Sequence, residues 1–190
     1  MIKAVIFDFG GVVHSLGKRK LSEILVERTN KKLEEIKPLL GPLLLEMSVK
    51  AINEDQFWEM LGGKTEGVWE EQMRYDCIHS PVVELVKKLK RKKITTAVLS
   101  NTIAPHAEIL ANRGWYKYFD RVFLSFEIGL RKPDIKAYEH VLKELGVTGE
   151  ECIFIDDILE NLGPAKSLGI KTVLATSPDQ VVREVRELIE

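Results

Sequence analysis

The sequence predicts an α/β fold, a Rossmann-like doubly wound parallel sheet with a small α-helical unit inserted after the first strand. Short apolar runs rich in β-branched residues recur at 2–7, 94–99, 121–125, 152–155 and 171–175. Such runs are typical of strands that are buried on both faces. Amphipathic stretches separate the later runs, at 81–91, 105–113, 134–145 and 159–168. Because strand and helix alternate from about residue 80 onward, we expect a parallel sheet.

Residues 14–79 interrupt this alternation, because they contain no clear strand and have the pattern of several helices. Those helices are expected in the stretches LSEILVERT, KLEEIKPLL, NEDQFWEML and VWEEQMRYD. Asn53 is a suitable N-cap, with Asp55 in the first turn that follows it. We therefore predict a core formed by 1–13 and 80–190 and a helical insertion formed by 14–79.

Individual residues mark the expected ends of the helices in the core. Ser80 precedes a proline and is expected as an N-cap, and Pro133 is expected in the first turn of the helix at 134–145. Gly146 and Gly169 are expected as helix stops.

The composition is that of a soluble globular protein, with 190 residues, 45% hydrophobic residues, 30% charged residues and a formal net charge of -1. No basic excess favours nucleic acid as a partner. Cys77 and Cys152 lie far apart and indicate neither a disulfide framework nor a zinc site, so a cytoplasmic protein is expected. The chain also shows no apolar run long enough for a membrane span.

Polar residues directly follow four of the apolar runs, where open parallel sheets bind their ligands. They are Asp8 with Gly10 and Gly11, Ser100 with Asn101 and Thr102, Ser125 with Glu127, and the pair Asp156 and Asp157. The carboxyl ends of parallel strands share one edge of a sheet. Three of the four places, those with Asp8, Ser100 and Asp156, supply groups suited to phosphate chemistry.

The carboxylates of this set predict an all-oxygen metal site. Asp156 and Asp157 are adjacent at the end of a buried strand, and like charges packed together are costly unless a cation or a proton separates them. With Asp8 nearby they suit Mg2+, which holds few protein carboxylates and keeps water and phosphate in its shell. The simpler alternatives are that Asp8 completes a turn, and that one of the paired aspartates caps a helix while the other is solvated.

Two further segments offer groups suited to a phosphate. The hydroxyl, amide and backbone donors of Ser100, Asn101 and Thr102 precede the helix that begins near residue 105. Lys132 lies in the loop sequence GLRKPD, where its ammonium could neutralise both a nucleophile and a phosphate. An ordinary turn and a solvated lysine are the alternatives.

Taken in order, FDFGGVV, LSNT, GLRKPD and FIDDILEN resemble the four signature motifs of the haloacid dehalogenase superfamily. The last two motifs and their surroundings are similar to the phosphatase domain of soluble epoxide hydrolases and to bacterial sugar 1-phosphatases of that superfamily. The resemblance implies a Mg2+-dependent phosphatase acting on a small phosphorylated metabolite, such as a sugar phosphate, as a monomer or small homo-oligomer. It also implies that residues 14–79 are the helical cap of the first cap class.

The resemblance further implies a role for each motif residue. Asp8 would attack phosphorus and form an aspartyl-phosphate, and Ser100, Asn101 and Lys132 would hold the phosphoryl group. The metal ligands would be Asp8, Asp157, the backbone carbonyl of Gly10 and, as an additional contact, Asp156. Asn161 would support these ligands from behind.

Gly10 departs from the superfamily pattern, because most of its phosphatases carry a second aspartate there as general acid and base. General acid catalysis is typically worth about a hundredfold to ten-thousandfold, so simple alcohol esters are expected to be poor substrates. Leaving groups that need less protonation, such as a sugar 1-phosphate or an acyl phosphate, would be affected less. His14 lies just beyond the motif and is a candidate substitute, with packing or solvation as the alternative.

The helical insertion also contains candidate specificity residues, because Phe57, Trp58, Met60 and Trp69 could line its inner face. Aromatic residues at helical spacing are more often bundle core. Two other functions stay open for the whole chain: hydrolytic dehalogenation, which uses an aspartate nucleophile on this fold without a metal, and a non-catalytic phosphate-binding or regulatory role.

Overall fold

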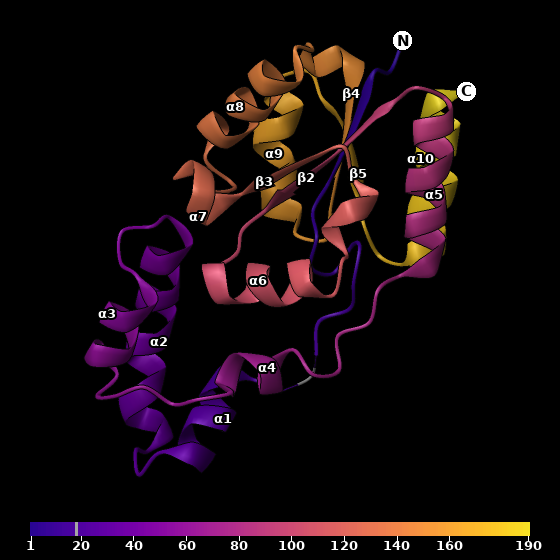
Figure 1. Ribbon diagram of the computed structural model, residues 1–190. Helices are drawn as coiled ribbons and strands as arrows, with labels where there is room; N and C mark the ends of the chain where they lie inside the picture. Colours follow the sequence, from indigo (N-terminus) through magenta and orange to yellow (C-terminus); the bar gives the residue numbers. More distant parts are fainter. Residues whose placement is uncertain (18) are drawn as a thin grey trace.

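The computed structural model describes residues 1–17 and 19–190 and has a five-stranded parallel sheet at its centre (Figure 1). The strands are β1 (Ala4–Phe7), β2 (Thr95–Ser100), β3 (Arg121–Leu124), β4 (Cys152–Asp156) and β5 (Lys171–Leu174). They lie in the order β3-β2-β1-β4-β5, and every neighbouring pair is parallel. The predicted α/β class is confirmed, and all five expected strands are present.

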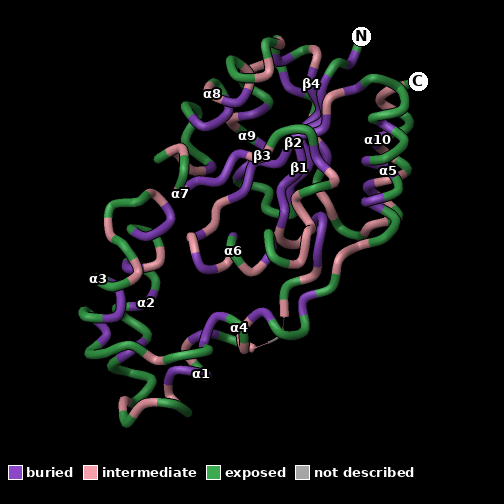
Figure 2. The backbone as a smooth tube through the Cα atoms, in the orientation of Figure 1, coloured by how far each residue is buried: buried purple, intermediate pink, exposed green. Residues whose placement is uncertain are grey.

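Helices cover both faces of the sheet, because alternate residues of each buried strand point to opposite sides. Val5 and Phe7 of β1 belong to an apolar cluster shared with α5 (Ser80–Arg91) and α10 (Pro178–Ile189). Ala4 and Ile6 belong to a second cluster, shared with α8 (Ile135–Leu145) and α9 (Leu159–Ser167). Figure 1 shows these two helix pairs on opposite sides of the sheet, and Figure 2 shows the buried strands between them.

Four helices occupy most of the predicted insertion: α1 (Leu21–Arg28), α2 (Leu33–Ser48), α3 (Glu54–Met60) and α4 (Val68–Gln72). Figure 1 shows α1, α2 and α3 grouped away from the sheet. Phe57, Trp58 and Trp69 are buried in an apolar cluster formed largely by these helices, whereas Met60 is 53% exposed. The bundle-core interpretation of the aromatic residues is therefore confirmed. The boundary of the insertion as a separate domain stays a prediction.

Two chain segments connect this helical group to the sheet, and they run side by side. The backbone N–H of Ser15 donates to the carbonyl of Cys77 at 2.9 Å, and that of His79 donates to the carbonyl of Val13 at 2.8 Å. Between them, His14 and Ile78 form an antiparallel bridge. The entry and exit of the insertion are thus hydrogen-bonded to each other next to the end of β1.

The structure corrects two predicted helix starts. Helix α5 begins at Ser80 and its N-cap is His79, whose main chain and ring bond to the carbonyls of Val13 and Val12 and hold it extended. Helix α8 has Asp134 as N-cap, with a side chain that accepts a hydrogen bond from the N–H of Lys136, so Pro133 precedes the helix. The predicted cap at Asn53 is confirmed, since its side chain accepts from the N–H of Gln56 at 2.9 Å.

Gly146 is the C-cap of α8, with a left-handed φ of 66°, and Gly169 directly follows the C-cap of α9, with a φ of 81°. The remaining helical elements are α6 (Ala104–Asn112), η1 (Tyr116–Tyr118), α7 (Ser125–Ile128) and η2 (Gly149–Glu151). Across residues 1–17 and 19–190, no helix is both long and apolar enough to cross a membrane.

Candidate active site

The sheet brings two of the predicted carboxylates side by side. Strands β1 and β4 are neighbours, and Phe7 is paired with Ile155, so the next residues along each strand are Asp8 and Asp156. The N–H of Asp8 donates to the carbonyl of Ile155 at 2.8 Å, which extends the pairing by one residue. The position of both carboxylates therefore follows from the parallel register.

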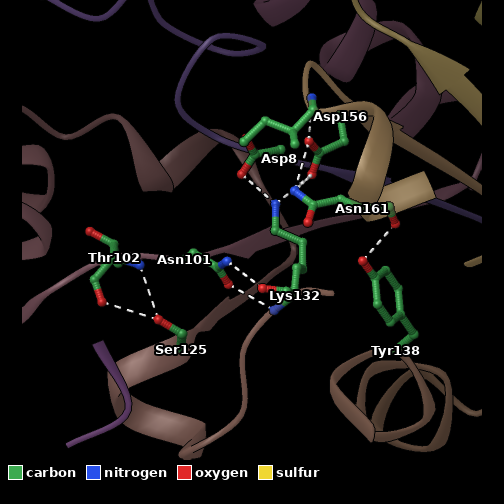
Figure 3. A network of polar contacts seen from close by, with 9 residues as sticks. Asp8, Asn101, Thr102, Ser125, Lys132, Tyr138, Asp156 and Asn161 are labelled. Atoms are coloured by element: carbon green, nitrogen blue, oxygen red, sulfur yellow. Dashed lines mark hydrogen bonds and ion pairs between the residues drawn. The ribbon is translucent and has the colours of Figure 1, made fainter. Parts of the chain in front are cut away.

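Lys132 lies between these two carboxylates (Figure 3). Its Nζ is 2.7 Å from Asp8 Oδ1 and 2.6 Å from Asp156 Oδ2, and the side chain of Lys132 is 1% exposed. A buried ammonium needs close partners of opposite charge, and here it has two. Because two carboxylates surround one cation, the group keeps an excess of negative charge, as a metal site requires.

Asp156 is fully buried, and protein donors surround its carboxylate. Oδ1 accepts from the N–H of Ile158 at 2.8 Å, and Asn161 Nδ2 lies 3.0 Å from Oδ1 and 3.1 Å from Oδ2. The hydroxyl of Tyr138 donates to the carbonyl of Asn161 at 2.6 Å, so Asn161 is itself held in place. These contacts fix Asp156 as the group that orients Lys132, while its additional metal contact stays a prediction.

Asp157 has a different environment from its neighbour, because it is exposed and lies against the backbone of Gly11. A Cβ built on Gly11 would come within 2.6 Å of the carboxyl carbon of Asp157, and Gly11 has a left-handed φ of 78°. Position 11 therefore needs glycine both for its backbone conformation and for the close approach of this carboxylate.

The three carboxylates fit the predicted Mg2+ site. One oxygen from each of Asp8, Asp156 and Asp157 lies within 4.8 Å of the others. Burial, aided by the charge of Asp156, raises the pKa of Asp8 to about 6, although Lys132 acts in the opposite direction. Burial and the charge of Asp156 also raise the pKa of Asp157. A divalent cation would relieve this repulsion, and hard oxygen donors are the ligands that Mg2+ prefers.

Asn101 holds the backbone of Lys132 with both ends of its amide. Its Nδ2 donates to the carbonyl of Lys132 at 2.8 Å, and its Oδ1 accepts from the N–H of Lys132 at 2.9 Å. Nearby, Ser125 Oγ accepts from the N–H of Thr102 and donates to its carbonyl, at 3.0 and 3.1 Å. The side chain of Asn101 thus positions Lys132, and its predicted contact with phosphate stays a prediction.

A pocket of about 210 Å3 opens beside these groups. Nine residues named from the sequence line it: Asp8, Gly10, His14, Ser100, Asn101, Thr102, Lys132, Asp157 and Asn161. Asp156 lies behind them, out of the lining. The structure therefore brings the predicted motif residues together at one pocket, with Asp156 as the supporting partner of Lys132. Of the other strand-end residues, Ser125 bonds to the backbone of Thr102, and Glu127 lines a different pocket.

Another part of the pocket wall contains residues that sequence reasoning missed. Leu16, Met73, His106 and Leu110 line it together with His14. Burial lowers the pKa of His106 to about 4, and its Nε2 is 3.1 Å from Gln72 Oε1. The sequence did contain a signal for His106, because this residue lies in the first turn of the helix that follows LSNT, at the predicted site. Leu16 and Met73 offered no local signal, because their place depends on the path of the insertion.

His14 is a buried member of this wall. It is 2% exposed, and its Nδ1 lies 3.0 Å from the carbonyl of Ser15 and 3.4 Å from Asp76 Oδ2. Burial lowers the pKa of His14, with Ser15 and Asp76 acting in the opposite direction. Its Nε2 lies 3.8 Å from the point where a Cβ on Gly10 would stand. The predicted candidate to replace an acid at position 10 thus lies beside that position, and its role stays a prediction.

The sequence matches a known family model and is similar to known proteins. Residues 2–169 match the family model described as haloacid dehalogenase-like hydrolase. The chain is 27% identical over 196 residues to a sesquiterpene phosphatase of Aspergillus oryzae, covering 98% of this chain and 96% of that protein. It is 31% identical over 120 residues to a drimenol cyclase of Aspergillus calidoustus, covering 62% of this chain but only 22% of the cyclase.

Solved structures show the same fold. A haloacid dehalogenase (HAD)-like family hydrolase of Porphyromonas gingivalis aligns with a TM-score of 0.85 at 23% identity, covering 100% of this chain and 98% of that one. A HAD family enzyme of Bacteroides thetaiotaomicron, in complex with magnesium and inorganic phosphate, aligns with a TM-score of 0.78 at 26% identity. That alignment covers 91% of this chain and 93% of the other.

Proposed function

This chain belongs to the haloacid dehalogenase-like hydrolase family, and we propose that within it the chain is a Mg2+-dependent phosphatase that hydrolyses a small phosphorylated metabolite through an aspartyl-phosphate. The observation that carries the proposal is the Asp8 carboxylate, which lines the pocket with one oxygen 2.7 Å from the buried Lys132 ammonium. A carboxylate beside a fixed cation and further acidic oxygens suits attack on phosphorus, because phosphoryl transfer chiefly requires positioning and charge neutralisation.

The metal would be held by Asp8, Asp157 and the carbonyl of Gly10, with Asp156 as the additional contact. When bound, Mg2+ would neutralise the charge on the phosphoryl oxygens. The descriptions of two relatives support this proposal. One relative is a sesquiterpene phosphatase, and the other is a family enzyme in complex with magnesium and inorganic phosphate.

The protein groups supply the covalent step and the positioning. A carboxylate oxygen of Asp8 forms a bond to phosphorus, and the bond from phosphorus to the leaving oxygen breaks. Ser100 and Lys132 hold the phosphoryl oxygens, and Asn101 keeps Lys132 in register through the backbone. Water then attacks the phosphorus, returns Asp8 as a carboxylate and releases inorganic phosphate.

The residue at position 10 limits the leaving group. Glycine has no proton to give to a departing alkoxide, so esters of simple alcohols should react slowly. Sugar 1-phosphates and acyl phosphates have leaving groups that need less protonation, and they fit this site better.

We propose that residues 14–79 act as a cap over this site. Leu16 and Met73, close to the two ends of that segment, both line the pocket. A lid of this kind excludes water and contacts the substrate. The aromatic residues Phe57, Trp58 and Trp69 stabilise the cap and do not line the pocket.

The test is phosphate release from sugar 1-phosphates, sugar 6-phosphates, nucleotides and acetyl phosphate, each with Mg2+ and with excess EDTA. We expect Mg2+-dependent release that favours 1-phosphates or acetyl phosphate. Release that persists in EDTA would contradict the metal site. If no phosphate is released while halide is released from a 2-haloacid in EDTA, the chain is a dehalogenase instead.

A further inference from the structure

The pocket wall contains a buried histidine, His14, and no residue that the structure describes bonds to its Nε2. His14 Nδ1 lies 3.0 Å from the carbonyl of Ser15, and because a carbonyl only accepts, Nδ1 carries the hydrogen. In the neutral ring Nε2 then has a free lone pair. None of the residues in 1–17 and 19–190 donates a hydrogen bond to that atom. The ring is 2% exposed, so a bound molecule is the natural source of a donor.

His14 Nε2 lies close to the position that a side chain at residue 10 would occupy. A Cβ on Gly10 would stand 3.8 Å from His14 Nε2, and both residues line the pocket. Since Gly10 is two residues from Asp8, the volume around this position lies next to the reacting centre. Leu16 Cδ2 would lie 3.1 Å from the same Cβ, so the side chain of Leu16 closes part of this volume. The pocket beside it has a hydrogen-bond acceptor, His14 Nε2, in its wall.

Most of the rest of that wall is apolar. Leu16, Met73 and Leu110 are apolar, and His106 Nε2 already pairs with Gln72 Oε1 at 3.1 Å. His14 is also fixed from behind, because Asp76 Oδ2 lies 3.4 Å from its Nδ1 and Asp76 Oδ1 accepts from the N–H of Gly17 at 2.5 Å. The ring is therefore held at a set position for recognition.

We propose that His14 is a specificity-determining residue whose Nε2 accepts a hydrogen bond from a hydroxyl of the leaving group, beside the esterified carbon. The substrate class is then the phosphate esters of sugars and other polyols. This inference rests on the proposed phosphatase function, and it gives that function a leaving group with a hydroxyl on the neighbouring carbon.

The test compares glucose 1-phosphate with 2-deoxyglucose 1-phosphate, which differ only in that hydroxyl. His14→Asn keeps a donor for the Ser15 carbonyl but removes the acceptor at Nε2, whereas His14→Gln can place an amide oxygen where Nε2 stood. For His14→Asn we expect the ratio of the two kcat/KM values to fall roughly tenfold, as for the loss of one hydrogen bond. For His14→Gln the ratio should return most of the way to that of the wild type.

A purely structural role for His14 would lower kcat/KM for both esters equally and leave the ratio unchanged, which would overturn the inference. If no ester is hydrolysed, the proposed function fails. Calorimetric binding of the same two esters to Asp8→Asn and to Asp8→Asn/His14→Asn, with Mg2+, then decides the inference separately. A weakening confined to glucose 1-phosphate supports it, while equal weakening, no weakening or no binding of either ester overturns it.

Discussion

The sheet side of the pocket and the helical side are built differently. On the sheet side, Lys132 is buried between Asp8 and Asp156, and Asn161 bonds to Asp156 from behind. On the helical side, the wall is mostly apolar, and none of the described residues donates to His14 Nε2. The first arrangement suits a reaction whose charges must be fixed in advance, and the second suits recognition of a particular leaving group. Changes on the two sides should therefore affect different properties.

The largest effect should come from Asp8→Asn on the sheet side. Loss of the nucleophile is expected to lower kcat by on the order of 10^4-fold or more, because the covalent route is removed while the surrounding contacts are kept. Phosphate release gives the rate, and circular dichroism checks that the fold is intact. Undiminished turnover by a folded variant would rule out Asp8 as the nucleophile.

Replacing Lys132 by Met should reduce stability as well as activity. The change leaves the carboxylates of Asp8 and Asp156 facing each other without their cation, and breaking a buried pair in this way costs about 3–5 kcal/mol. Urea unfolding in EDTA measures the loss. Lys136→Met is the matched control, because Lys136 is exposed, and it should change the free energy of unfolding by less than about 0.5 kcal/mol. Equal values for the two variants would contradict the buried network.

The pH dependence of stability should also reveal the cost of ionising the buried carboxyl of Asp8. The raised pKa of Asp8 means that the folded state favours the protonated carboxyl. This group therefore contributes its full stabilisation to the fold below the ordinary pKa of 3.8, and that stabilisation is lost as the pH rises through about 6. This difference between the two pKa values of Asp8 corresponds to roughly 3 kcal/mol in the free energy of unfolding. In EDTA, wild type should lose this much relative to Asp8→Asn between pH 4 and pH 7, and saturating Mg2+ should reduce the loss. Parallel curves for the two proteins would contradict the assignment.

Asp157→Ala tests the exposed member of the acidic pair. We expect the Mg2+ concentration at half-maximal activity to rise about 10- to 100-fold, because one oxygen ligand is removed while the buried network around Lys132 stays intact. A Mg2+ titration of phosphate release measures the change. Glu160→Ala, an exposed acid on the following helix, is the control. An identical titration for the two variants would place the metal elsewhere.

The smallest effect should come from the helical insertion, at Glu54. Its Oε1 accepts from the indole N–H groups of both Trp58 and Trp69, at 2.9 and 2.8 Å. Glu54→Ala leaves both donors unpaired and should cost about 2 kcal/mol of stability with little change in KM. Thermal unfolding and kinetics measure the two quantities, with the exposed Met60→Ala as control. A large rise in KM at unchanged stability would indicate instead that these aromatic residues contribute to substrate specificity.

Much of the sheet side could be predicted from the sequence, because its signals are local. An apolar run followed by Asp8, another followed by Asp156 and Asp157, and the sharing of one edge by parallel strands were sufficient to assemble the acidic group. The helix starts at Ser80 and Pro133 were misplaced by one or two residues. At Ser80, tertiary bonds from His79 to Val12 and Val13 decide where the helix begins.

The sequence by itself determined the α/β class and the residues that meet at the strand ends, since periodicity and connectivity constrain both. Only the tertiary structure decided which of the two adjacent aspartates is buried, that Asn101 holds the backbone of Lys132, and that the ring of His14 lies beside Gly10. The physical reason is that each of these depends on a contact in three dimensions. Asn101 and Lys132 are 31 residues apart, and no local pattern reports which of its neighbours a side chain will bind.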